Sequence, residues 1–213
     1  MAKYWEQPRT IFMDFPISQA CVAYKTGDIV SFTRAWKDLA VETVFDVPFV
    51  SISRTHSVRE GDGKTARFYR LHFPDWANIF AITPDYEVVF VHQFRQGVMQ
   101  FTLELPGGVM EPGEDPIKAA ARELREETGY TASEWVRLES IYPNPAIQDN
   151  RCTTFIAKNA RHTHPTEFDP DEELEIELIP LHDVPRRTLH GQVTNAVIVA
   201  GIARALAALG IIS

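Results

Sequence analysis

The helix pattern at residues 116–128, PIKAAARELREET, constrains the fold most, because it has one apolar face and one acidic face. Its apolar residues recur at the spacing that places side chains on one side of a helix: Ile117, Ala120, Ala121 and Leu124. Gly129 follows directly, as is common where helices end. The apolar face has to be buried, so the sequence predicts a folded domain whose core this helix covers in part.

The acidic face gathers three carboxylates, because positions three and four apart on a helix are neighbours: Glu123, Glu126 and Glu127. Unpaired carboxylates at this spacing repel one another. Divalent cations bind carboxylate and phosphate oxygens together, so a metal site would make use of the same crowding. A solvated surface helix is the alternative, since charge runs usually face water. The run alone leaves both interpretations open.

β-rich segments with alternating or continuous apolar residues surround the helix. We expect one hairpin from residues 49–60 and 65–74, and a second, more buried hairpin within residues 78–94. Further strands are expected at residues 101–105, 135–141, 152–158 and 174–179, followed by a mostly apolar helix at about 195–209. This order predicts an α/β fold with a mixed sheet covered on both faces.

Residues 1–48 are harder to interpret. Within them, residues 31–45 place several apolar side chains at helical intervals behind Ser31, a common cap residue: Phe32, Trp36, Leu39 and Ala40. The spacing predicts a short helix there.

The composition argues against several classes of protein. A net charge of −8 disfavours a general nucleic-acid binder, which needs a basic surface to displace the counterions of phosphates. The two cysteines, Cys21 and Cys152, are far apart in the sequence, as expected for free thiols in a reducing compartment. The N-terminus lacks the apolar stretch of a signal peptide, and no apolar run reaches membrane-spanning length. We therefore expect a cytoplasmic protein that does not bind membranes.

A wider spacing decides between the two interpretations of the acidic helix. Gly108, five residues, Glu114, seven residues and then RELREETG at 122–129 match the fixed positions of the Nudix box, so the chain resembles the Nudix hydrolase family. Only the last position departs, because Tyr130 stands where the box prefers an aliphatic residue. The resemblance implies that Glu114 and Arg122 hold the box together.

The resemblance also implies a loop-helix-loop that binds Mg2+ or Mn2+, with two or more ions per site, and hydrolyses a diphosphate linked to another group. Carried onto matching positions, it makes Glu123, Glu126 and Glu127 the metal ligands and catalytic residues. The carbonyl of Gly107 is a further expected metal ligand.

Residues beside the box resemble the ADP-ribose and nucleoside diphosphate sugar pyrophosphatase branch of the family. The similar segments are ELPGG at 104–108, HQFRQGV at 92–98 and the two prolines Pro143 and Pro145 after the box. The branch typically has Ser-Pro-Gly and an acid where this chain has Asn-Pro-Ala at 144–146, so the preferred base and sugar stay open.

Hydrolysis also needs a base for the attacking water, and in this branch an acid from a loop after the box serves. That position points to Glu172 or Glu173. Four residues are candidates to bind substrate: Arg95 at the end of a buried strand, Arg54 and Arg67 on the upstream strands, and Glu104. For the two upstream arginines, a surface ion pair is the alternative.

Together, these observations predict an α/β/α Nudix sandwich with a mixed sheet at residues 76–213 and an N-terminal arm of uncertain role at 1–48. The β-rich segment at 49–75 is similar to the N-terminal subdomain of that branch, and the resemblance implies that it is a dimerisation segment. The expected enzyme hydrolyses ADP-ribose or a related nucleoside diphosphate sugar to a nucleoside monophosphate and a sugar phosphate, and forms a homodimer. Two alternatives stay open. One is a pyrophosphatase for damaged nucleotides or a dinucleotide cofactor, and the other is a Nudix-like module that senses a nucleotide sugar without cleaving it.

Overall fold

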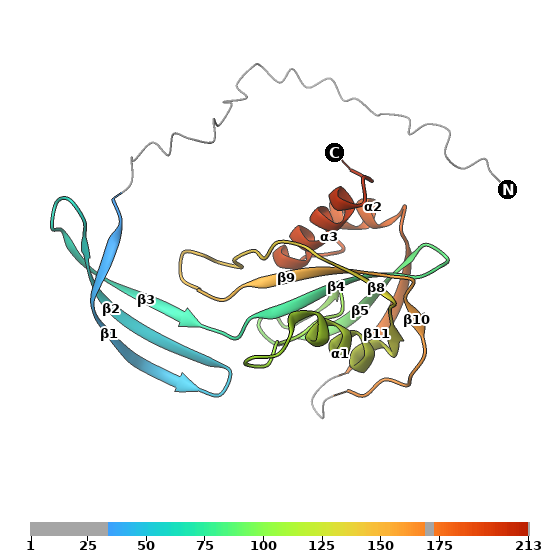
Figure 1. The fold of residues 1–213 in the computed structure, drawn as a ribbon, viewed down its shortest axis with the longest axis horizontal. Helices are drawn as coiled ribbons and strands as arrows, with labels where there is room; N and C mark the ends of the chain where they lie inside the picture. The colour runs from blue at the N-terminus through green and yellow to red at the C-terminus, as the bar shows by residue number, and fades with distance from the viewer. Residues whose placement is uncertain (1–33, 169–172, 213) are drawn as a thin grey trace, which may run out of the picture. The chain divides into compact units, whose positions relative to one another are not determined.

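The computed structural model describes residues 34–168 and 173–212 (Figure 1). Its strands are β1 (Trp36–Val47), β2 (Val50–Arg59), β3 (Thr65–His72), β4 (Trp76–Ile82), β5 (Glu87–Arg95), β6 (Gln100–Glu104), β7 (Tyr130–Thr131), β8 (Glu134–Arg137), β9 (Cys152–Lys158), β10 (Arg161–His162) and β11 (Leu174–Pro180). Its helices are α1 (Pro116–Thr128), α2 (Val184–Leu189) and α3 (Ala196–Ala208).

The central layer is a mixed sheet with the strand order β11-β5-β4-β9-β8, and β6 pairs with β5 as well. Only β4 and β9 run parallel, from Trp76 beside Cys152 to Ile82 beside Lys158. The other pairs in this sheet are antiparallel. The prediction of a mixed sheet is therefore confirmed.

The two faces of this sheet are covered by different helices, α1 on one side and α3 on the other (Figure 1). Successive side chains of a strand point to opposite faces, so β4 contributes to both cores. Ile79 packs in the cluster that contains Leu124 of α1. Its neighbour Phe80 packs in the cluster that contains Ile202 of α3. The expected α/β fold with helices on both faces is confirmed.

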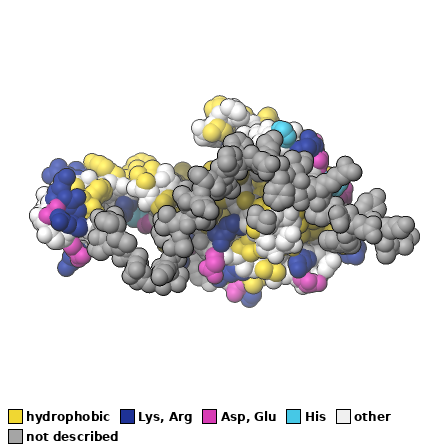
Figure 2. Space-filling view, turned by 90° about the horizontal axis from the view of Figure 1, so that it is seen from above, with side chains coloured by type: hydrophobic (Ala, Val, Ile, Leu, Met, Phe, Trp, Pro, Cys, Tyr) yellow, Lys and Arg dark blue, Asp and Glu magenta, His cyan; other side chains and the backbone are white. Residues whose placement is uncertain are grey.

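A separate three-stranded antiparallel sheet is formed by β1, β2 and β3, in that order. Figure 2 shows many hydrophobic side chains at the surface of this part of the molecule. The large hydrophobic residues exposed on it are Trp36, Leu39, Val41, Val44, Phe45, Phe49, Phe68 and Tyr69. Such an apolar surface is typical of a segment that contacts another molecule.

The predicted helix at residues 31–45 is wrong for its described part, because residues 36–47 form strand β1. Ser31 and Phe32 lie outside the described residues. β1 pairs with β2 from Trp36 beside Arg59 to Val47 beside Val50, and the ring of Trp36 meets that of Phe68 edge-on at 5.0 Å. Pairing with a distant strand thus overrides the helical spacing of a short segment.

The β3 end of this sheet is bonded to the loop that precedes β9. The N–H of Leu71 donates to the carbonyl of Ile147 at 2.8 Å, and His72 Nδ1 lies 2.5 Å from Asp149 Oδ2. The other ring nitrogen of His72 lies 2.8 Å from the hydroxyl of the buried Ser53. These bonds anchor the loop that carries Asn-Pro-Ala at 144–146.

The expected elements around the box are confirmed. Helix α1 has the bounds that the sequence predicts, β9 matches the expected strand at 152–158, and α3 matches the expected C-terminal helix within a residue or so at each end. The expected strand at 135–141 is shorter, because β8 ends at Arg137. No helix in the described ranges is long and apolar enough to cross a membrane.

Gly129 offers a test of how tightly the end of α1 is packed. It has φ of 71°, and a Cβ added there would lie 2.1 Å from the carbonyl oxygen of His164. Gly113 also has positive φ, 81°, but nothing lies within 4 Å of its added Cβ. Gly113→Ala should therefore cost only the left-handed backbone penalty, about 1–2 kcal/mol, and Gly129→Ala clearly more.

Urea unfolding of both variants measures this difference. Equal free energies of unfolding for the two variants would contradict the tight contact between Gly129 and the segment around His164.

Candidate active site

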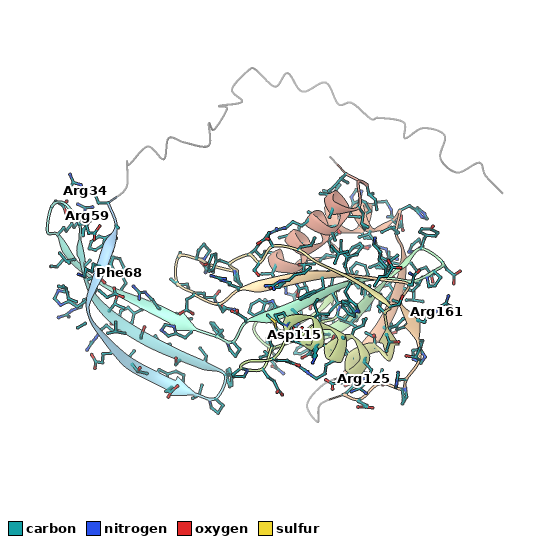
Figure 3. All side chains as sticks on the ribbon, viewed as in Figure 1. Arg34, Arg59, Phe68, Asp115, Arg125 and Arg161 are labelled. Atoms are coloured by element: carbon teal, nitrogen blue, oxygen red, sulfur yellow. The ribbon has the colours of Figure 1, made fainter. Side chains whose placement is uncertain are left out.

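Helix α1 has defined ends, which fixes where its acidic face lies. The carboxylate of Asp115 accepts hydrogen bonds from the N–H groups of Ile117, at 3.0 Å, and Lys118, at 3.3 Å. At the other end, the N–H of Gly129 donates to the carbonyl of Arg125 at 2.8 Å. Figure 3 labels Asp115 and Arg125 near opposite ends of the helix. The three glutamates of the box lie between these caps, in the last two turns.

Glu127 connects the helix to the loop after β6. Its side chain is buried, with the residue only 4% exposed, and its Oε2 accepts a hydrogen bond of 2.8 Å from the N–H of Gly107. A buried carboxylate is stable only when hydrogen bonds or cations compensate its charge. Glu127 is therefore held at the loop by a directed contact.

The two glycines of this loop allow the close approach. A Cβ on Gly108 would lie 2.5 Å from Oε2 of Glu123, too close for the carboxylate to keep its position. A Cβ on Gly107, whose φ is 154°, would lie 2.0 Å from the carbonyl oxygen of Ala77 on β4. A side chain at Gly107 would push the loop away from the backbone of β4, whereas one at Gly108 would displace the carboxylate of Glu123.

Arg122 lies among the acids of the box and bonds several of them. Its Nε and Nη2 donate to the two oxygens of Glu114, each at 3.1 Å, and Nη1 donates to Glu123 at 2.8 Å and to Glu126 at 3.1 Å. The bond to Glu114, with the charge of Glu123 and the hydrogen bonds to Glu123 and Glu126, raises the pKa of Arg122 above its ordinary value. The predicted role of Glu114 and Arg122 in holding the box together agrees with these contacts.

This arrangement modifies the electrostatic argument from the sequence. Arg122 and Arg125 each donate to Glu126, so two cations of the protein offset part of the repulsion between the carboxylates. Crowded acids therefore do not by themselves require a metal ion. The chemistry of the donor set still fits one, because hard divalent cations bind carboxylate oxygens.

A pocket of about 590 Å³ opens beside the acidic face. Its lining residues are Gln93, Arg95, Gly107, Gly108, Val109, Glu111, Arg122, Glu123, Glu126, Glu127 and Glu167. Within residues 34–168 and 173–212, no three His, Cys, Asp or Glu side chains already form a metal-binding cluster. Glu123 and Glu126 point to Arg122 instead, so ion binding would exchange these bonds for metal contacts.

Arg95 is anchored at the edge of this pocket by a buried acid. Its Nε and Nη2 donate to the two oxygens of Glu104 at 2.9 and 3.0 Å. Glu104 is only 1% exposed, and it also accepts from Thr102 Oγ1 at 2.6 Å and from Asn195 Nδ2 at 3.1 Å. Burial would raise the pKa of the Glu104 carboxyl, but these hydrogen bonds and the charge of Arg95 hold it below its ordinary value.

A second pocket, of about 260 Å³, shares Arg95 and the segment 107–109 with the first. Its other lining residues are Trp76, Asn78, Glu104, Leu105, Asn195, Val197 and Ile198. A ligand with its phosphates near Arg95 therefore has room on both sides of this arginine.

The structure does not bring the other arginine candidates into either pocket. Arg54 and Arg67 line a pocket of about 190 Å³ on the three-stranded sheet, where Arg54 pairs with Glu42 at 2.6 Å. The ion pair that was the alternative for Arg54 is thus present. Of the two expected bases, Glu172 lies outside the described residues. Glu173 is exposed. It precedes Leu174, which pairs with Gln93, a lining residue of the pocket beside the acidic face.

Glu167 is an acid of the pocket that the sequence did not single out. Its N–H donates to the carbonyl of Glu126 at 2.8 Å, and its carboxylate pairs with Arg125 at 2.9 Å. It belongs to the same acid-rich loop as Glu172 and Glu173, so the loop was a usable signal. Only the contact with the end of α1 distinguishes it from its neighbours.

The sequence profile of the NUDIX domain matches residues 72–197, well over half of the chain. This chain belongs to the Nudix family. The matched range contains α1, the loop after β6 with Gly107 and Gly108 (the glycine loop), and the lining of both pockets up to Val197. The family prediction made from the box is confirmed.

Relatives that carry the name ADP-ribose pyrophosphatase include two bacterial proteins. The protein from Bacillus subtilis is 30% identical over 148 residues, which cover 69% of this chain and 80% of the relative. The protein from Mycobacterium tuberculosis is 28% identical over 169 residues, which cover 78% and 81%. A crystal structure of an ADP compounds hydrolase superposes with a TM-score of 0.72 over 84% of this chain and 98% of that chain, at 19% identity, and shows the same fold.

Arg122→Ala tests the role of Arg122 as the internal counter-cation. We expect it to lower the free energy of unfolding by about 1–3 kcal/mol in metal-free buffer, because it removes charged hydrogen bonds among partly buried acids. Arg186→Ala is the control, since Arg186 pairs with Asp183 at the surface and its loss should change little. Urea unfolding in chelator measures both, and an equally small change would show that the acids do not depend on Arg122.

Proposed function

We propose that this Nudix enzyme hydrolyses the diphosphate bond of ADP-ribose or a related nucleoside diphosphate sugar. The observation that carries the proposal is the pocket in which Glu123, Glu126 and Glu127 lie together with Arg95. Acids that bind cations and an arginine that binds phosphate are the groups that this reaction needs in one place. The names of the two relatives support the choice of ADP-ribose.

The three glutamates of the box would hold the divalent metal, Mg2+ or Mn2+, with the carbonyl of Gly107 as a further ligand. When bound, the ions supply Lewis acidity and lower the pKa of a bound water. The protein's own contribution is to hold Glu127 through the N–H of Gly107 and to keep Arg95 at the pocket. More than one ion per site is part of the proposal, because the pocket is lined by several acids.

The reaction adds one water across the P–O–P bridge. The water oxygen bonds to one phosphorus, the bond from that phosphorus to the bridging oxygen breaks, and a base accepts a proton from the water. From ADP-ribose, the products are AMP and ribose 5-phosphate. Glu167 is the described acid of the downstream loop that lines the pocket, and it joins Glu172 and Glu173 as a candidate base.

The proposal includes a cytoplasmic homodimer with a small nucleotide as its substrate and no nucleic acid partner. The exposed apolar surface of the three-stranded sheet supports self-association through this sheet, which contains β1 in addition to the expected segment at 49–75. Arg54 and Arg67 lie on the same sheet and remain proposed substrate contacts in the assembly. Light scattering on the purified protein measures the mass, and a monomer would refute the dimer.

Glu127→Gln should abolish most of the activity without unfolding the protein. We expect wild-type protein to convert ADP-ribose to AMP and ribose 5-phosphate only with Mg2+ or Mn2+. We expect the variant to lose about a hundredfold or more in kcat, the scale of losing one charged contact in a transition state. Chromatography of the products over a panel of nucleotide substrates measures both.

The control is Glu134→Gln. Glu134 lies on the exposed strand β8, accepts a hydrogen bond from Asn159 and lines neither pocket. Pyrophosphate released from a nucleoside triphosphate would favour nucleotide clean-up instead. Tight binding of ADP-ribose without turnover would favour the sensing module.

Glutamine substitutions at Glu167, Glu172 and Glu173 identify the base. We expect Glu167→Gln to lower kcat by about 10²-fold or more with little change in KM, because general base catalysis acts on the transition state. If Glu167 is the base, the other two variants stay within a few-fold of wild type, and the same loss in Glu172→Gln or Glu173→Gln assigns the role to that residue instead. The pH dependence of kcat is the second measurement, since loss of the base removes the acidic limb of the profile. A full acidic limb in Glu167→Gln would exclude Glu167.

A further inference from the structure

Glu104, the acid that holds Arg95 at the pockets, is unusually buried for a carboxylate. Glu104 lies at the end of β6 with 1% of its surface exposed, while the Arg95 side chain remains 45% exposed. Burying a carboxylate costs several kcal/mol by general estimates, and apolar residues of similar size often replace such pairs without loss of stability. A purely structural role therefore explains Glu104 poorly.

The acceptor positions of Glu104 are all in use. A carboxylate offers about four sites for hydrogen bonds. Oε1 accepts from Arg95 Nε and Thr102 Oγ1, and Oε2 accepts from Arg95 Nη2 and Asn195 Nδ2. A substrate hydroxyl would have to displace one of these donors to reach Glu104.

Asn195 links this carboxylate to helix α3. Its Nδ2 donates to Glu104, and its Oδ1 accepts from the N–H of Val197 at 3.1 Å, which caps the helix. Asn195 and Val197 also line the second pocket. The chain of contacts thus runs from the first turn of α3, through Glu104, to the guanidinium at the border of both pockets.

We propose that Glu104 and Asn195 are positioning residues that fix the guanidinium of Arg95 for the diphosphate and do not touch the substrate themselves. The inference rests on the proposed function and assigns Glu104 a different role from the substrate contact expected from the sequence. Two parallel hydrogen bonds hold one edge of the guanidinium, which limits its rotation. An arginine that is already oriented loses less freedom when it binds a phosphate.

Glu104→Gln keeps the shape of the side chain and removes its charge. Because Arg95 contacts the diphosphate in the bound state and the transition state alike, the variant should raise KM for ADP-ribose about tenfold with kcat within about threefold of wild type. Calorimetry with inorganic pyrophosphate and Mg2+ gives a second readout that needs no turnover. The same loss of affinity is expected there.

The decisive measurement repeats Glu104→Gln in an Arg95→Ala background. If Glu104 acts only through Arg95, its substitution should no longer raise KM, and KM should even fall, because the unpaired carboxylate then repels the diphosphate. A tenfold rise in KM that persists in this background means that Glu104 contacts the substrate directly, and it overturns the inference.

Asn195 has a matched pair of variants. Serine is a good helix cap but too short to reach Glu104, whereas alanine loses both contacts. Asn195→Ser and Asn195→Ala should raise KM alike, and the alanine variant should lower the urea midpoint further than the serine variant, because it loses the helix cap as well as the bond to Glu104. If KM is unchanged in both Asn195 variants, Asn195 is not a positioning residue, and that part of the inference is overturned.

Leu206→Ala controls for general loosening of α3, since Leu206 is a core residue of that helix, 2% exposed. We expect lower stability with unchanged KM, and a tenfold higher KM would overturn a specific role for Asn195. Wild-type protein that neither cleaves nor binds ADP-ribose refutes the proposed function and the inference with it. Wild-type activity with independent effects of Glu104 and Arg95 overturns the inference alone.

Discussion

The contact between the glycine loop and the last turns of α1 is the constraint on which the site depends. The loop leaves β6, passes close to the backbone of β4, and meets both Glu123 and Glu127. Helix α1 is fixed to the sheet by Leu124 and its apolar neighbours. The backbone of this acidic face is therefore fixed beside the pocket, while Glu123 and Glu126 can exchange their bonds to Arg122 for those to a ligand.

Arginines of the protein offset the negative charge of these carboxylates in two ways. Arg122 bonds acids of the box directly, and Arg95 is itself held by the buried Glu104. The first arrangement keeps the carboxylates together in the free protein. The bond to Glu104 keeps the cation of Arg95 at the border of the two pockets. A diphosphate bound there would have one of its two linked groups in each pocket.

Much of the fold and part of the site were predictable from the sequence. The bounds of α1 follow from its apolar spacing, Asp115 and Gly129, all of which are local signals. β1 was not predictable in this way, because its strand form depends on pairing with β2 and not on its own spacing. The same limit applies to Asn195, which meets Glu104 across 91 positions of the chain. Glu167 was missed because its distinguishing contact is likewise made with the distant end of α1.

The border between the two pockets consists of Arg95 and the segment 107–109, whose glycines contribute only main chain. Main-chain atoms are not changed by substitution, and a Cβ on Gly107 would clash with the backbone of β4. The side chains of the outer walls, such as Trp76, Asn78 and the first turn of α3, are therefore the natural positions at which to change the preferred substrate. The residues for hydrolysis and the residues that select the ligand thus lie in different pockets, on either side of Arg95 and the segment 107–109.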